Sequence, residues 1–106
     1  MEKLIEEMKS RDEDGWIVVV EGIKDFEVLK DLGIKNVYIF NGYRRAFSDL
    51  FGKKVVVLTD YDEKGIEIAK KLKEVLNADV EIMKRIFSLI KKDATKVEEL
   101  KHFLEK

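Results

Sequence analysis

Apolar positions along the chain alternate between two kinds of pattern. Continuous apolar runs at residues 16–20 and 55–58 are typical of strands buried on both faces of a parallel sheet. Shorter runs at residues 37–40 and 80–83 predict two further strands. The sequence therefore predicts four strands, each separated from the next by a segment of different periodicity.

The segments between these runs have the spacing of helices. Apolar residues recur every three or four positions before Gly33 and again before Asn77, two residue types that suit the left-handed end of a helix. Apolar residues at helical spacing within residues 47–51 predict a short helix between the second and third strands. We expect two more helices, one around residues 4–8 and one over residues 95–105.

Strands and helices that alternate in this way predict a three-layer α/β/α domain with a four-stranded parallel sheet and right-handed crossovers. We expect the strand order 2-1-3-4, with the first strand beside the third. At 106 residues the chain has the length of a single domain, which we place over residues 1–106.

Composition excludes several classes of site. The chain has no cysteine and one histidine, which excludes disulfides, thiolate nucleophiles and zinc sites built on sulfur. The longest apolar run, residues 16–20, is far too short to span a membrane, and the charged N-terminus lacks a signal-peptide pattern, so we expect a cytoplasmic protein. The net charge of -1 means that any surface for nucleic acid must be a local basic patch.

Acidic residues directly follow the first and third predicted strands. Glu21 follows the first strand, and Asp60 and Asp62 follow the third. Ligands of open parallel sheets bind beyond the carboxyl ends of the strands, so these carboxylates converge there if the two strands are neighbours. Because such carboxylates repel each other, they indicate a divalent cation such as Mg²⁺. Gly22 and Gly65 would let the backbone approach a phosphate closely.

Simpler interpretations stand beside this one. Asp62 is also placed to cap the helix that follows it, which is compatible with metal binding. Asp25 fits equally well as a helix cap or as support for the site. A receiver-like phosphorylation of Asp60 ranks last, because a later strand-end lysine is missing.

Arginine is scarce, and its guanidinium group suits phosphate. We therefore take Arg44, Arg45 and Arg85 as candidate phosphate contacts near the carboxyl edge of the sheet. Lys53 and Lys54 precede the third strand and are expected at the opposite edge.

Two segments resemble the signatures of a known family. Residues 19–25 (VVEGIKD) and 58–65 (LTDYDEKG), each after a buried strand and before a helix, look like the two motifs of the Toprim domain. That domain is shared by topoisomerases, bacterial-type primases, some nucleases and ribosomal-RNA maturases, and the resemblance covers residues 16–87. It implies a Rossmann-like fold, Glu21 as a general acid/base or metal ligand, and a Mg²⁺ ion, replaceable by Mn²⁺, on Asp60 and Asp62.

The resemblance implies two functions. The first is a Mg²⁺-dependent nuclease or maturase that acts on the phosphodiesters of RNA or DNA. The alternative is an adaptor module that binds metal and nucleic acid, or a protein partner, without turnover. Topoisomerase and primase activities are not expected, because each needs further domains that 106 residues do not hold. The sequence favours neither RNA nor DNA and indicates no oligomeric state.

Overall fold

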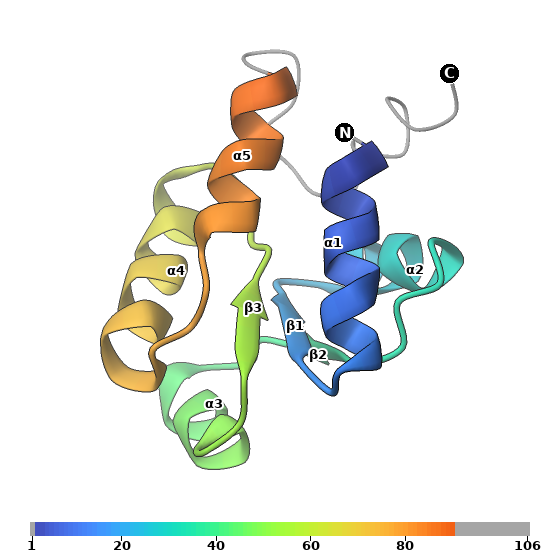
Figure 1. The fold of residues 1–106 in the computed structure, drawn as a ribbon. Coiled ribbons are helices and arrows are strands. Elements are labelled where there is room, and N and C mark those ends of the chain that lie inside the picture. The colour runs from blue at the N-terminus through green and yellow to red at the C-terminus, as the bar shows by residue number, and fades with distance from the viewer. Residues whose placement is uncertain (1, 91–106) are drawn as a thin grey trace.

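A computed structural model describes residues 2–90 of the chain (Figure 1). The helix expected over residues 95–105 lies outside the described residues. Along the chain the elements are α1 (Glu2–Glu13), β1 (Ile17–Val20), α2 (Ile23–Asp31), β2 (Val37–Ile39), α3 (Tyr43–Leu50), β3 (Val55–Val57), α4 (Glu63–Leu76) and α5 (Glu81–Ile90).

The described strands form a three-stranded parallel sheet in the order β2-β1-β3. Val18 of the central strand lies opposite Val37 on one side and Val56 on the other. Val18, Val19 and Val20 are fully buried, which explains the continuous apolar run. The α/β class, the parallel sheet and the position of the first strand between the second and third are thus confirmed.

The prediction of a fourth strand over residues 80–83 is wrong. Next to this segment, Asp79 makes an isolated parallel bridge to Val56 of β3, and residues 80–83 do not extend it. The Asp79 carboxylate then accepts a hydrogen bond from the backbone N–H of Glu81 at 2.8 Å and starts helix α5 instead. The apolar residues of this segment are buried at helical spacing, as Ile82, Met83, Ile86 and Phe87.

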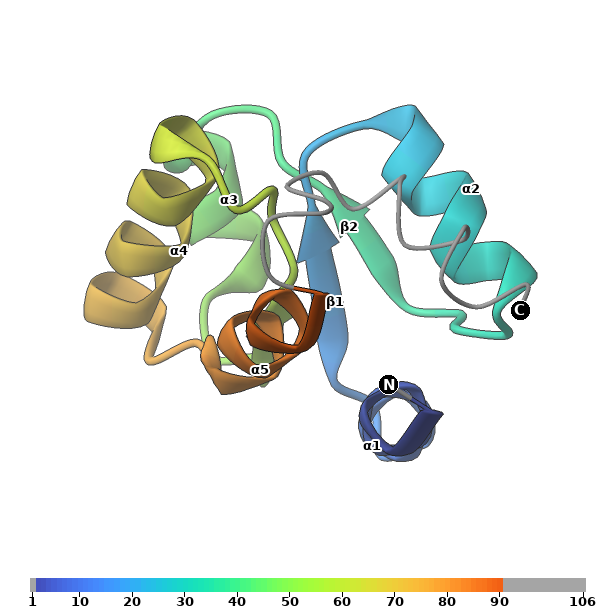
Figure 2. The same ribbon diagram turned by 90° about the horizontal axis from the view of Figure 1, so that it is seen from above.

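Helices cover both faces of the sheet. Figures 1 and 2 show α1 and α5 side by side on one face and α3 with α4 on the other, while α2 lies beside β2 at the sheet edge. The helix expected around residues 4–8 is α1, which buries Leu4, Ile5 and Met8. None of the helices within residues 2–90 is long and apolar enough to cross a membrane.

Helix ends return the chain to the sheet. After α2, Gly33 has a φ of +92°, and the N–H of Ile34 donates to the carbonyl of Leu29 at 3.0 Å. This is the expected glycine stop, with buried Ile34 and Leu29 as its hydrophobic contact. Asn77 ends α4 with a φ of +55°, also as expected. Both ends adopt the left-handed conformation that their residue types favour.

A buried carboxylate holds α1 against the entrance of β2. Asp12 is 6% exposed and accepts hydrogen bonds from the backbone N–H groups of Lys35, at 2.9 Å, and Asn36, at 2.7 Å. The Asn36 amide donates in return to the Asp12 carbonyl at 3.1 Å. These bonds satisfy backbone groups just before β2 and set where that strand begins.

Candidate functional site

The structure brings Glu21 and Asp60 together at the carboxyl edge of the sheet. Strands β1 and β3 pair in register, and the N–H of Leu58 continues the ladder by donating to the carbonyl of Val19 at 2.8 Å. Beyond the strands, Glu21 Oε1 accepts a hydrogen bond from the backbone N–H of Asp60 at 2.9 Å. Two residues 39 positions apart in sequence are therefore in direct contact at the edge where ligands bind such sheets.

Burial and negative neighbours act on Glu21 in the same direction. Partial burial raises the pKa of the Glu21 carboxyl, and the charges of Asp60 and Asp62 raise it further. The Asp60 N–H and the Lys64 ammonium oppose this pKa shift only in part. A cation at this edge would therefore favour the ionised form of Glu21.

Asp62 is the N-cap of α4. Its Oδ1 accepts a hydrogen bond from the backbone N–H of Gly65 at 2.8 Å. The expected capping role is therefore present, and it uses one of the two carboxylate oxygens. The cap also holds the Asp62 charge at the positive end of the helix dipole, close enough to affect the pKa of Glu21.

Gly65 is required by the packing of α4 on the site. A Cβ atom at this position would lie 1.9 Å from the carbonyl oxygen of Asp60 and 2.7 Å from Glu21 Oε1. The buried Thr59 hydroxyl donates to the Gly65 carbonyl at 2.7 Å and so fixes the same turn of helix from the strand side. A phosphate contact at Gly65 stays a prediction, since packing alone explains the glycine.

Sequence reasoning did not identify the role of Thr59. The signal was a lone hydroxyl residue at the end of an apolar strand, six positions before a glycine. The contact itself depends on how α4 turns back over the strand end.

Asp25 shapes the backbone that follows Glu21. Its Oδ2 accepts a hydrogen bond from the Gly22 N–H at 3.2 Å, and the side chain is 7% exposed. Asp25 therefore caps α2, which is one of its two expected roles. A Cβ at Gly22 would have no neighbour nearer than 3.9 Å, so this position is open, and its phosphate contact stays a prediction.

Tyr43 is a site neighbour that the sequence reasoning missed. Tyr43 is the first residue of α3, just after the loop that follows β2. The Lys71 ammonium lies 4.8 Å from the centroid of its ring. Burial raises the pKa of the Tyr43 hydroxyl, and the charges of Glu67 and Glu21 raise it further. The signal was its position after the second strand, at the same sheet edge as Glu21.

Among the three candidate arginines, Arg45 shares a groove with Glu21. It lines an open groove of about 660 Å³ together with Glu21, Tyr38 and Asp49, whose carboxylate accepts the Tyr38 hydroxyl at 2.7 Å. Arg44 is exposed at the preceding position of α3.

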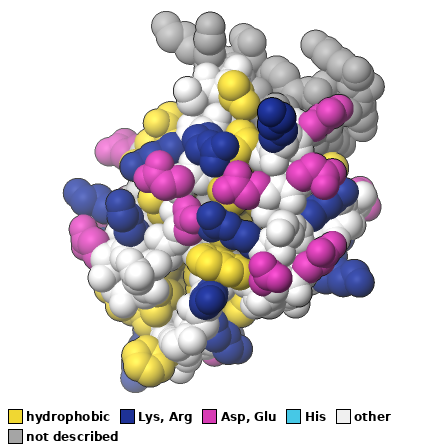
Figure 3. Space-filling view, viewed as in Figure 1, with side chains coloured by type: hydrophobic (Ala, Val, Ile, Leu, Met, Phe, Trp, Pro, Cys, Tyr) yellow, Lys and Arg dark blue, Asp and Glu magenta, His cyan; other side chains and the backbone are white. Residues whose placement is uncertain are grey.

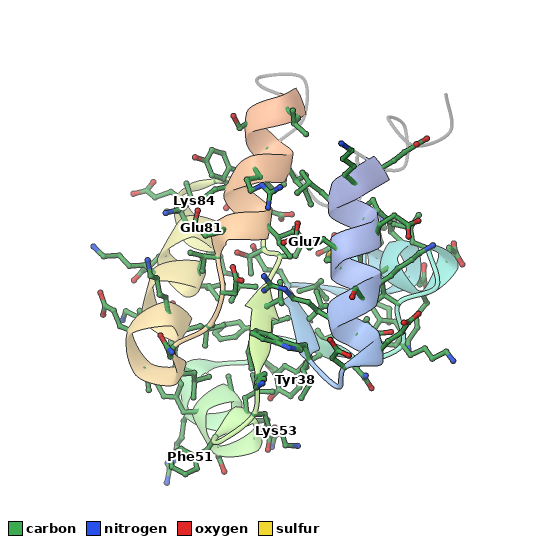
Figure 4. The ribbon with its side chains drawn as sticks, viewed as in Figure 1. Glu7, Tyr38, Phe51, Lys53, Glu81 and Lys84 are labelled. Carbon is green, nitrogen blue, oxygen red and sulfur yellow. The ribbon has the colours of Figure 1, made fainter. Side chains whose placement is uncertain are left out.

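The other basic candidates have different surroundings. Because α5 replaces the fourth strand, Arg85 lies on a helix, where its guanidinium donates to Glu7 at 3.0 Å. Figure 4 shows Glu7 between α1 and α5, and Lys53 at the opposite end of β3. In the face viewed in Figure 3, basic and acidic side chains are mixed, so that face carries no broad basic surface.

The donor chemistry of the acidic residues fits Mg²⁺. Glu21, Asp60 and Asp62 offer hard carboxylate oxygens, although Glu21 and Asp62 each use one oxygen for a backbone N–H. Within the described part of the chain, no group of three His, Cys, Asp or Glu side chains is arranged to hold a metal ion. A Mg²⁺ ion here would therefore take one or two of these carboxylates and keep several of its waters.

Comparisons with known proteins agree with the α/β fold. The chain is 44% identical over 108 residues to a UPF0292 protein of Archaeoglobus fulgidus, covering 96% of this chain and 87% of that protein. It is 36% identical over 93 residues to a UPF0292 protein of Thermococcus kodakarensis, covering 78% and 69% of the two chains. A solved structure from Aquifex aeolicus superposes with a TM-score of 0.77 at 30% identity, over 93% of this chain and 96% of that one. Residues 15–85 match the Toprim domain, so the chain belongs to the Toprim domain family.

Proposed function

We propose that this protein is a Mg²⁺-dependent nuclease that hydrolyses phosphodiester bonds of nucleic acid at the carboxyl edge of its sheet. The observation that carries the proposal is the contact between Glu21 Oε1 and the Asp60 N–H, which gathers carboxylates from two strands at one place. Membership of the Toprim domain family supports a metal-binding role related to nucleic acid.

Each acidic residue has a distinct role in the proposal. Asp60 and Asp62 would hold a Mg²⁺ ion, for which Mn²⁺ could substitute. When bound, the ion supplies positive charge that offsets the charge developing on the phosphate oxygens. Glu21, whose pKa is raised by burial and by its acidic neighbours, serves as the general base.

The proposed hydrolysis of a phosphodiester needs no reagent other than water. A water oxygen attacks phosphorus as Glu21 accepts the proton of that water, and the bond from phosphorus to the leaving sugar oxygen breaks. The sugar oxygen then takes a proton from solvent. Arg45, in the groove beside Glu21, neutralises a neighbouring phosphate of the strand.

The test is a cleavage assay. Labelled structured RNA, single-stranded DNA and double-stranded DNA are each incubated with the protein in Mg²⁺, Mn²⁺ or EDTA. We expect cleavage that requires the metal and that is lost in Asp60→Asn and Glu21→Gln. Glu74→Gln, an exposed carboxylate elsewhere on α4, is the matched control and should cleave normally. Absence of metal-dependent cleavage on all three substrates contradicts the proposal.

A binding module without turnover is the second candidate. It is favoured by the net charge of -1 and by the incomplete carboxylate set within residues 2–90. In this case the same assay gives retarded but intact nucleic acid, or no retardation when the partner is a protein. Retardation that depends on Mg²⁺ and on Asp60 supports this candidate over the nuclease.

A further inference from the structure

A second concave site lies between α4 and α5, next to the acidic residues. It encloses about 250 Å³ and its surface is mainly apolar, with Tyr61, Ile66 and Met83 among the residues that form it. This volume is slightly below the range of about 300–1,000 Å³ for drug-sized ligands, so it suits a single ring system. Tyr61 lies between Asp60 and Asp62 in sequence, so one residue that lines the pocket is bonded to both candidate metal ligands, although neither aspartate lines the pocket itself.

The pocket presents an aromatic surface that is held in place from behind. The ring of Tyr61 stacks on Phe87 with centroids 5.3 Å apart and an interplanar angle of 15°. Phe87 is 2% exposed, whereas Tyr61 is 43% exposed, so the stack supports the Tyr61 ring without covering it. Ile66, 44% exposed, adds apolar surface on α4. A planar ring that enters the pocket would therefore meet a preformed aromatic and aliphatic surface.

Three lysines surround this apolar surface. Lys70 and Lys73 lie one turn apart on α4, and Lys84 faces them from α5. Figure 4 shows Lys84 on the side of α5 toward α4, near Glu81, whose carboxylate lies 3.7 Å from its ammonium. Within residues 2–90, these three ammonium groups have one acidic partner within 4.0 Å, which leaves a positive rim that favours an anion.

We propose that the pocket binds one nucleotide, with its base against Tyr61 and Ile66 and its phosphate on the lysine rim. The role of the pocket in catalysis would be to place a nucleic-acid strand beside Glu21 and Asp60, and this role rests on the proposed function. Nucleotide binding to the pocket requires neither metal nor cleavage. A nucleotide joins an aromatic ring to an anionic phosphate, and these two groups match the apolar surface and the lysine rim of the pocket. The nucleotide comes from the end of a strand or from the free pool.

The experiment measures binding without metal. The protein in EDTA is titrated with AMP, UMP, adenosine, inorganic phosphate, a 5′-phosphorylated tetranucleotide and a hexaglutamate peptide, while NMR follows the Met83 methyl and the Tyr61 ring. We expect AMP or the tetranucleotide to shift both signals saturably and to bind at least tenfold more tightly than adenosine, phosphate or the peptide. The tighter of the two nucleotide probes identifies the source.

Variants separate the rim from the aromatic surface. Lys70→Glu should weaken AMP binding at least tenfold, while Lys53→Glu, the same charge change at the other end of β3, should leave it unchanged. Tyr61→Leu should remove the preference for AMP over phosphate, and Tyr61→Phe should keep it.

Three results overturn the inference: unshifted Met83 and Tyr61 signals, equal loss in Lys70→Glu and Lys53→Glu, or hexaglutamate that binds as tightly as AMP. Because the titration contains no metal, its outcome is independent of the cleavage assay. AMP binding without cleavage contradicts only the proposed function, and cleavage without AMP binding contradicts only the pocket.

Discussion

The backbone N–H of Asp60 donates a hydrogen bond to Glu21 Oε1 at 2.9 Å, so the two strand-end motifs of this chain meet in one contact. Neither motif positions the other locally, because 39 residues separate them. The pairing of β1 with β3 brings them together and places a carboxyl with a raised pKa among other acidic groups. This relationship makes the edge of the sheet a candidate site for a cation and for proton transfer.

Metal binding should stabilise the folded protein. An ion that binds only the folded state at 100 times its Kd adds about 2.7 kcal/mol to the free energy of unfolding. Asp60→Asn with Asp62→Asn should remove the Mg²⁺-induced rise in Tm and slightly raise the Tm of the metal-free protein, since carboxylate repulsion is lost. Asn is itself a good N-cap, so α4 keeps its start. Differential scanning calorimetry with and without Mg²⁺ measures this, and an unchanged Mg²⁺ response in the double variant would exclude both residues as ligands.

Gly65→Ala should destabilise the protein even though alanine favours helices. The added Cβ would fall 1.9 Å from the Asp60 carbonyl oxygen, so the backbone must shift, at a cost of about 1–3 kcal/mol as for other overpacked sites. Gly22→Ser is the control, because that position has no neighbour within 3.9 Å and serine is a favourable N-cap. Urea denaturation of both variants compares the two effects. Equal stability of Gly65→Ala and the wild type would show that this packing is not tight.

Asp12→Ala should be among the most destabilising changes outside the site. It removes the acceptor of two backbone N–H groups, those of Lys35 and Asn36, in a buried position. Each unsatisfied group costs about 1–3 kcal/mol, so we expect a loss of about 2 kcal/mol or more in the free energy of unfolding. Asp14→Ala, an exposed carboxylate nearby, should change it by less than about 0.5 kcal/mol. Denaturation midpoints measure both changes.

Asp79 should contribute stability that depends on acid pH. Burial alone would raise its pKa, but hydrogen bonds and charge from Arg11, together with the N–H of Glu81, lower it below the ordinary value of 3.8. As the pH falls, Asp79 therefore takes up a proton in the unfolded chain before it does so in the folded protein. Its contribution to stability is complete above the pKa of the unfolded chain and is lost as the pH drops through the pKa of the folded protein. The difference in unfolding free energy between wild type and Asp79→Asn should shrink over that interval. A difference that stays constant from pH 5 to pH 2 would contradict this assignment.

Nucleic-acid binding, if it occurs in the groove beside Glu21, should depend on Arg45. Loss of one phosphate contact reduces the slope of log K against log salt concentration by about 0.7 to 0.9, so Arg45→Ala should flatten the salt dependence by that amount. Lys53→Ala is the matched control, because that lysine precedes β3 and lies at the opposite end of the strand. Fluorescence anisotropy at several salt concentrations gives both slopes. Equal slopes for Arg45→Ala and wild type would place the strand elsewhere.

The pattern of apolar residues by itself determined the α/β class, the buried parallel strands and the residues at their carboxyl ends. A strand buried on both faces must be apolar throughout, and this pattern can be recognised in the sequence without knowing which strands pair with it. The same logic put Glu21, Asp60 and Asp62 beyond the strand ends, and the left-handed preferences of Gly33 and Asn77 marked helix ends.

Tertiary structure decided the features that depend on contacts between distant segments. Residues 80–83 have apolar spacing that suits either a short strand or a helix. The strand pairing ends at the bridge between Asp79 and Val56, and the Asp79 carboxylate then accepts the N–H of Glu81 and starts the helix. The reason for glycine at position 65 and the hydroxyl at position 59 appears only when α4 packs on the strand ends. Short-range pattern reports which face of an element is buried, but a hydrogen bond or close contact between segments dozens of residues apart exists only once the sheet has aligned them.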